Sequence, residues 1–180
     1  MARRETTHVN GIEISHLRAG DGPPLVMLHG IGGNATQFRN QLDAFADSHT
    51  VIAWDAPGYG GSDDPGDDWQ MPDYADALAG LLDVLGLDQF HLLGQSWGGV
   101  LAQVFSGRYP ERVHSLILSD TSMGGGAQPE AERLASLNAR LNALATMTPA
   151  EMATARTPAV LGPSPTAAVA AEVEAMMAQI

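Results

Sequence analysis

Apolar and polar residues alternate along residues 6–19, on both sides of an Asn10–Gly11 pair. Alternation with a period of two is typical of a strand that buries one of its faces. Asn-Gly accepts the positive φ angles of a tight hairpin turn. These residues are therefore predicted to form an antiparallel hairpin at the edge of a sheet.

From Leu25 onward, short apolar runs alternate with segments of helical periodicity. Apolar runs without alternation are typical of strands that are buried on both faces of a parallel sheet. The predicted strands are residues 25–28, 51–55, 90–95 and 115–120, and the predicted helices are residues 34–48, 72–85 and 97–108. This alternation predicts an α/β fold with a mostly parallel sheet and flanking helices.

The composition changes after Asp120. Residues 121–129 are rich in glycine and predict a flexible connection, whereas residues 130–180 are rich in alanine and methionine and helical in pattern. We therefore expect a core over residues 1–122 and a helical cap over residues 123–180, laid over the sheet.

Composition excludes several classes of function. The chain has 180 residues and a net charge of −12 with only 9 Lys and Arg, which disfavours nucleic acid and anionic membrane surfaces as partners. It has no cysteine, which excludes disulfides and a thiolate nucleophile. No signal peptide is predicted, because no apolar segment follows the basic start of the chain, and no apolar run is long enough to span a membrane. We expect a cytoplasmic protein.

Neither a metal ion nor a cofactor is expected. The acidic stretch at residues 63–68 lacks the ligand spacing and the terminal glutamate of a calcium-binding loop. The glycine-rich loops lack the lysine of a phosphate-binding loop. A small-molecule substrate is therefore the expected partner.

One short motif carries candidate chemistry. Ser96 lies between Gly94 and Gly98 in a G-x-S-x-G pattern, after a predicted strand and before a predicted helix. A nucleophile elbow requires this context, because the serine sits on a sharp turn and the glycines leave room for the adjoining strand and helix. The hydroxyl would project above the carboxyl ends of the strands, where α/β sheets bind ligands. Ser96 is the candidate nucleophile.

A second glycine-rich loop, residues 29–33, follows the first parallel strand. Such a loop can aim a backbone N–H at a reacting carbonyl oxygen. The backbone amides of Ile31 and Trp97 are therefore the candidate oxyanion hole. Gly30 and Gln95 are candidate substrate contacts, and the other interpretation of Gln95 is a buried polar group that is bonded to backbone.

A third stretch, "WDAPGYGGS" at residues 54–62, completes a set of motifs that in order and spacing resembles the α/β-hydrolase superfamily. The resemblance extends to its smaller members, the 3-oxoadipate enol-lactonase-like and meta-cleavage-product hydrolase-like enzymes, and covers residues 6–122. It implies a serine hydrolase that acts through an acyl-enzyme on a small, largely apolar ester, lactone or vinylogous diketone. Asp55 is interpreted as a turn-capping group rather than a catalytic one.

The resemblance also implies a triad in the chain order nucleophile, acid, histidine. His114, the only histidine after Ser96, precedes a predicted strand, which puts it roughly 17–20 Å from the carboxyl ends of the strands. His29 ends a strand near the site but precedes the nucleophile. We therefore expect that this chain is the amino-terminal part of a longer enzyme, that its carboxy-terminal strands, acid and histidine are missing, and that the chain alone is inactive.

Two alternatives stay open. Asp120 ends the strand after the nucleophile helix and is a candidate for the triad acid; its other interpretation is a cap for the following loop or a substrate contact. The protein as a whole is alternatively a non-catalytic binding protein on the same scaffold.

Overall fold

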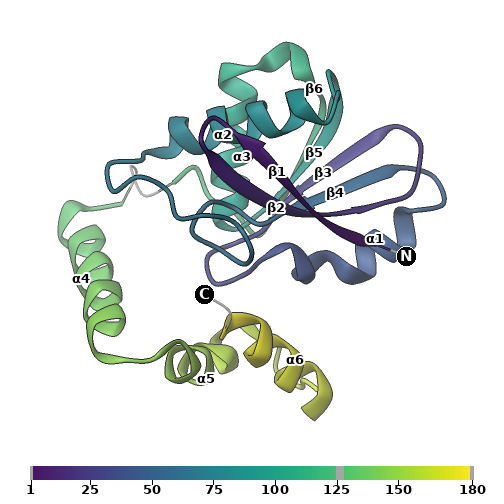
Figure 1. Cartoon of the computed structure of the whole chain (residues 1–180). Helices are drawn as coiled ribbons and strands as arrows, with labels where there is room; N and C mark the ends of the chain where they lie inside the picture. The colour runs from purple at the N-terminus through teal and green to yellow at the C-terminus, as the bar shows by residue number, and fades with distance from the viewer. Residues whose placement is uncertain (1, 125–127, 179–180) are drawn as a thin grey trace. The chain divides into compact units, whose positions relative to one another are not determined.

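The computed structural model describes residues 2–124 and 128–178. The chain divides into two compact units, Met1–Ser122 and Met123–Ile180. The elements of the first unit are β1 (Arg3–Val9), β2 (Ile12–Ala19), β3 (Pro24–Leu28), η1 (Ala35–Phe38), α1 (Arg39–Phe45), β4 (Thr50–Trp54), α2 (Met71–Val84), β5 (Phe90–Gln95), α3 (Trp97–Arg108), η2 (Pro110–Arg112) and β6 (Val113–Ser119) (Figure 1).

The strands of the first unit form one mixed sheet in the order β1-β2-β4-β3-β5-β6. β2 is antiparallel to β1 and to β4, whereas β3 is parallel to β4 and β5, and β5 is parallel to β6. The predicted α/β fold with a mostly parallel sheet is confirmed. The carboxyl ends of β3, β4, β5 and β6 share one edge of the sheet, so the loops that follow these strands lie near one another.

Helices cover both faces of the central strands (Figure 1). Along β3, Val26 and Leu28 belong to the cluster that packs against α2 and α3, whereas Leu25 and Met27 belong to the cluster that packs against η1 and α1. All four side chains are buried, which explains why β3 is apolar at consecutive positions.

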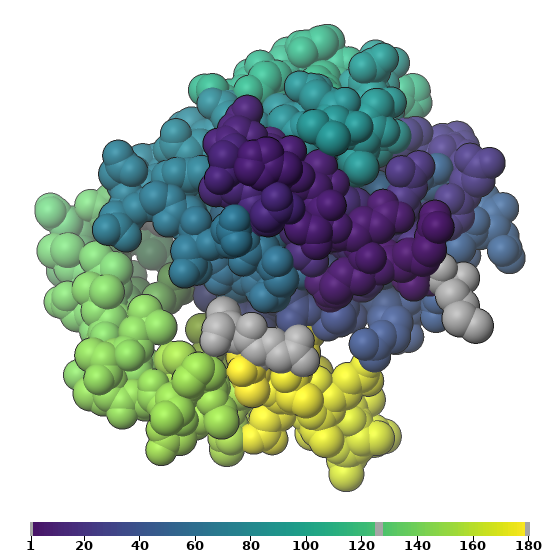
Figure 2. Space-filling view, viewed as in Figure 1, coloured from purple at the N-terminus to yellow at the C-terminus, as the bar shows by residue number. Residues whose placement is uncertain are grey.

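The predicted hairpin is present as β1 and β2. Asn10 and Gly11 form its turn with φ angles of 50° and 95°. Two successive positive φ angles are typical of a type I′ turn, whose twist matches that of the flanking strands. In Figure 2 the hairpin, in purple, lies at the surface that is turned to the viewer, and most residues of β1 are at least partly exposed.

The predicted helix over residues 34–48 differs from the observed structure. A 3₁₀ turn, η1, comes first, and the α-helix α1 ends at Phe45. The side chain of Asn34 accepts the Thr36 N–H and caps the 3₁₀ turn. After α1, the Phe45 carbonyl accepts the N–H groups of Ser48 and His49, which turn the chain into β4.

The second unit consists of α4 (Glu130–Thr146), α5 (Pro149–Val160) and α6 (Ala167–Met177). Its predicted helical character is confirmed, and residues 128–178 contain no strand. The predicted flexible connection lies partly outside the described residues, at 125–127. Among the described residues, no helix is both long and apolar enough to cross a membrane.

β6 forms an open, apolar edge of the sheet. Its carboxyl half carries Leu116, Ile117 and Leu118, whose exposed fractions are 37%, 44% and 44%. Three consecutive exposed aliphatic residues leave apolar surface on both faces of an edge strand, and such strands tend to pair with another chain.

We therefore expect the 180-residue chain to self-associate through β6. Ile117→Lys should shift the chain toward monomer, because a charge on an edge strand opposes edge-to-edge pairing. Sedimentation velocity over a range of concentrations measures the effect. Val84→Lys is the matched control, since Val84 is 62% exposed on α2, away from the sheet edge. A wild-type chain that stays monomeric throughout contradicts the prediction.

Candidate active site

Ser96 lies at the turn between β5 and α3, with φ 53° and ψ −118°. A non-glycine residue at positive φ is held there at a cost of about 1–3 kcal/mol. A Cβ added at Gly94 would collide with the Gly98 carbonyl oxygen, and one added at Gly98 would collide with the Leu28 carbonyl oxygen. The two glycines therefore allow α3 to begin directly against the ends of β3 and β5.

The end of β6 holds this turn from the other side. The Ser96 N–H donates to the Ser119 carbonyl at 3.0 Å, and the Thr121 hydroxyl donates to the Ser96 carbonyl at 2.6 Å. The Ser96 carbonyl also accepts the Gly99 N–H at 3.0 Å. Sequence reasoning missed Thr121, because no motif marks a residue that bonds to backbone 25 positions away.

The loop of residues 29–33 lies against Ser96. A Cβ added at Gly30 would stand 3.0 Å from the Ser96 Cβ. The Gly30 carbonyl accepts the Gly33 N–H at 3.0 Å and hydrogen-bonds the His29 ring at 2.9 Å. Because a trans peptide is planar, fixing this carbonyl turns the Ile31 N–H of the same peptide the opposite way.

The two candidate oxyanion donors, the Ile31 and Trp97 N–H groups, have no hydrogen-bond acceptor among the described residues. The Trp97 amide is also the first of α3, where the helix dipole favours negative charge. Two unpaired N–H groups that flank a serine on a tight turn can stabilise an oxyanion.

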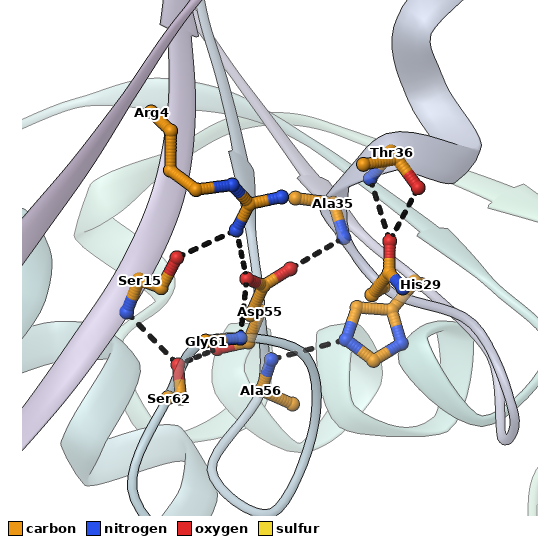
Figure 3. Close-up of polar contacts among 10 residues, drawn as sticks. Arg4, Ser15, His29, Ala35, Thr36, Asp55, Ala56, Gly61 and Ser62 are labelled. Carbon is orange, nitrogen blue, oxygen red and sulfur yellow. Dashed lines mark hydrogen bonds and ion pairs between the residues drawn. The ribbon is translucent and has the colours of Figure 1, made fainter. Parts of the chain in front are cut away.

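Both ring nitrogens of His29 are hydrogen-bonded, and Figure 3 shows the bond to Ala56. Its Nε2 accepts the Ala56 N–H at 3.0 Å, so its Nδ1 must carry the proton that is donated to the Gly30 carbonyl. The side chain is fully buried, and this burial lowers the pKa of His29 from its ordinary value of 6.5. His29 is therefore a neutral structural link with no lone pair left to serve as a base.

The other histidines lie away from Ser96. His49 precedes β4, and His91 and His114 are the second residues of β5 and β6, at the edge of the sheet opposite to Ser96. Their rings contact one another, with centroid distances of 6.2 Å for His49–His91 and 4.9 Å for His91–His114. His8 and His16 belong to the hairpin. In the part of the chain that the structure describes, no side chain hydrogen-bonds to the Ser96 hydroxyl.

Three other predicted site residues have definite surroundings. Asp120 follows β6 with φ 45°, and its side chain is exposed. Gln95 accepts a hydrogen bond from the Gln37 side chain at 3.1 Å, so its partner is a side chain rather than backbone. The indole of Trp97 packs against Tyr59 and Tyr74, with centroid distances of 6.2 Å and 5.2 Å.

Among the described residues, no group of three or more His, Asp or Glu side chains is placed to hold a metal ion. A cavity of about 190 Å³ lies elsewhere, between the hairpin and the start of α2, where Val9, Trp69 and Asp73 are among its lining residues.

Known proteins resemble this chain in sequence and in fold. The family described as alpha/beta hydrolase fold matches residues 23–156. The chain is 40% identical over 106 residues to the poly(3-hydroxyalkanoate) depolymerase of Ectopseudomonas oleovorans, a match that covers 59% of this chain and 38% of that protein. It is 44% identical over 109 residues to the 2-hydroxy-6-oxononadienedioate/2-hydroxy-6-oxononatrienedioate hydrolase of Burkholderia vietnamiensis. That match covers 58% of this chain and 38% of the relative. The chain thus spans less than two fifths of the length of these relatives.

A solved structure extends the likeness to nearly the whole chain. The crystal structure of a hydrolase from Pseudomonas aeruginosa PA01 superposes with a TM-score of 0.80 at 25% identity, over 98% of this chain and 66% of that one.

Gly98, which follows the turn at Ser96, gives a first prediction for the site. Gly98→Ala should lower the free energy of unfolding by about 1–3 kcal/mol, because its Cβ collides with backbone that cannot move aside. Gly107→Ala is the matched control in the same helix, since a Cβ there meets nothing within 4 Å. The control should stabilise the chain by about 0.5–1 kcal/mol through helix propensity. Urea unfolding measures both, and equal effects would contradict the packing argument.

The lowered pKa of His29 predicts acid sensitivity. Below its ordinary pKa of 6.5, the unfolded imidazole binds a proton that the folded one excludes, so the free energy of unfolding falls as the pH drops from there. His29→Gln should weaken this dependence, and Gly107→Ala should leave it unchanged. Burial also lowers the pKa of His16, so some dependence remains. Urea midpoints between about pH 5 and pH 8 test this; a variant with the wild-type slope would contradict it.

Proposed function

The chain belongs to the α/β-hydrolase family, and from that premise we propose that it is a hydrolase in which Ser96 is the nucleophile. The observation that carries the proposal is the pairing of a serine at positive φ with the loop of Gly30, whose Cα carries no side chain and so can lie against it. The Ser96 Oγ attacks a carbonyl carbon, and the Ile31 and Trp97 N–H groups stabilise the oxyanion that forms. The leaving group then departs, and water hydrolyses the acyl-enzyme.

The base and the acid in this proposal come from residues outside 1–180. A serine hydroxyl needs a base that removes its proton. His29 is engaged at both nitrogens, and the remaining histidines lie in the hairpin or at the opposite edge of the sheet. The greater length of the relatives supports this proposal, since only 38% of each is matched.

The proposed substrate is a small, largely apolar ester, lactone or vinylogous diketone. Two relatives support hydrolysis as the reaction through their names, which describe a poly(3-hydroxyalkanoate) depolymerase and a 2-hydroxy-6-oxononadienedioate/2-hydroxy-6-oxononatrienedioate hydrolase. Residues 123–180 are proposed as the helical cap of the hydrolase. No metal or cofactor takes part in the proposed reaction.

Chemical rescue tests the nucleophile in the chain as it exists. Because the proposed site lacks the base that would remove the Ser96 proton, added imidazole should accelerate the reaction of Ser96 with a fluorophosphonate, measured by peptide mass spectrometry. Ser96→Ala should abolish the imidazole-dependent labelling, and Ser106→Ala, a control within α3, should keep it. Asp120→Asn should also keep it, because the proposal takes the triad acid from elsewhere.

Two outcomes of this experiment would overturn the assignment. Labelling spread over several serines, with no preference for Ser96, would overturn the assignment of Ser96 as the nucleophile. A Ser96 that stays inert while the chain binds small esters would favour the non-catalytic binding protein. Loss of labelling in Asp120→Asn alone would instead assign the acid to Asp120.

A further inference from the structure

Asp55 is a fully buried carboxylate directly after β4. Its Oδ1 accepts the Ala35 N–H at 2.7 Å, and its Oδ2 accepts the Gly61 N–H at 3.0 Å and a bond from the Arg4 guanidinium. An isolated charge is costly to bury, so a carboxylate in this position depends on a counter-charge and on donors for its oxygens. Asp55 therefore does more than cap its own turn.

Arg4 reaches Asp55 from β1, at the edge of the sheet (Figure 3). The same guanidinium nitrogen donates to the Ser15 hydroxyl oxygen at 2.6 Å. Two further hydrogen bonds connect Ser15 back to Asp55. The Ser15 N–H donates to the Ser62 Oγ at 2.9 Å, and the Ser62 hydroxyl donates to the Asp55 carbonyl at 2.6 Å. The hairpin and the glycine-rich loop after β4 are thereby joined around one carboxylate.

The end of β4 also holds the segment of residues 29–35 at both of its ends. We call this segment, which contains Ile31, the oxyanion loop. At the start of the loop, the Ala56 N–H fixes the His29 ring, which in turn fixes the Gly30 carbonyl. At the end of the loop, the Asp55 carboxylate fixes the Ala35 N–H. The Gly30–Ile31 peptide, which carries one proposed oxyanion donor, lies between these two attachments.

We propose that Arg4 and Asp55 are positioning residues for the oxyanion loop. Arg4 supplies the counter-charge of the buried Asp55 carboxylate, and this carboxylate holds the loop in the position that points the Ile31 N–H at the oxyanion. The proposal rests on the proposed roles of Ser96 and Ile31. It extends the site to a residue of the N-terminal strand that touches neither the substrate nor the nucleophile.

The need for Arg4 follows from the burial of Asp55. Without the guanidinium, the buried carboxylate would lose its counter-charge and one of the two donors to its Oδ2. The remaining donors, the Ala35 and Gly61 N–H groups, carry no charge. An unpaired buried charge destabilises the arrangement, so the end of the loop, which donates through Ala35, would be held less firmly.

Amide hydrogen exchange of the 180-residue chain tests the proposal without any need for catalysis. Arg4→Met should speed exchange in residues 30–35 by roughly tenfold, the equivalent of losing one charge-assisted hydrogen bond. Arg3→Met is the matched control, with the same change of charge on the same strand. The Arg3 side chain is 78% exposed, and its guanidinium lies 3.8 Å from the Glu5 carboxylate. Its replacement should therefore leave exchange in the loop unchanged.

The outcomes separate positioning from general stability. Faster exchange that is confined to the loop and to residues 56–62 supports the proposal. Unchanged exchange in Arg4→Met overturns it, and so does an equal increase across β3, β4 and β5, which would mean that the pair only stabilises the fold. Ser15→Ala, which removes the second acceptor of the Arg4 guanidinium, serves as the milder variant if Arg4→Met does not fold.

A double-mutant cycle and a labelling experiment complete the test. Asp55→Asn removes the charge that Arg4 neutralises, so the effects of Arg4→Met and Asp55→Asn on exchange should be strongly non-additive. In the imidazole-dependent labelling of Ser96, Arg4→Met should lower the maximal rate without changing the half-saturating concentration of fluorophosphonate, and Arg4→Lys should restore part of that rate. An inert Ser96 in the wild type would refute the proposed function, whereas unaltered exchange would refute only the positioning role.

Discussion

The backbone turn at Ser96 is the constraint on which the site depends. A serine at φ 53° is held only if the surrounding chain fixes it from several directions. Gly94 and Gly98 allow the strand and the helix to meet at close range, and the end of β6 bonds to both sides of the Ser96 backbone. Ser96, the proposed nucleophile, is therefore positioned by three parallel strands, because their carboxyl ends share one edge of the sheet.

The loop after β4 links this turn to the rest of the first unit. Asp55 and Ala56 together hold both ends of the proposed oxyanion loop, and Asp55 also bonds to the N-terminal strand. Buried polar groups need partners, and here the partners lie on segments that are distant in sequence. The hydrogen bonds of the buried His29 and Asp55 side chains therefore connect the β1–β2 hairpin to the loop beside Ser96.

Much of the fold could be predicted from the sequence. β3 and β5 are short apolar runs that indicate buried strands, and Asn10–Gly11 indicates the hairpin turn between β1 and β2. The helix after residue 34 was predicted too long and too regular, since its first turn is shaped by the Asn34 cap and by the bond from Ala35 to Asp55. The motif around Ser96 predicted the elbow because glycine spacing is a local requirement. Thr121 and Arg4 carried no such signal, since their partners are 25 and 51 positions away.

The sequence by itself determined the class of the fold, the position of the elbow and the absence of cysteine chemistry, because each of these depends on local residue order or on composition. Only the tertiary structure decided the role of His29. A histidine beside a candidate nucleophile has the residue type of a base, but its two nitrogens are engaged by Ala56 and Gly30, one of which lies 27 positions along the chain. Hydrogen-bond partners across a sheet are set by packing, and local sequence does not encode them.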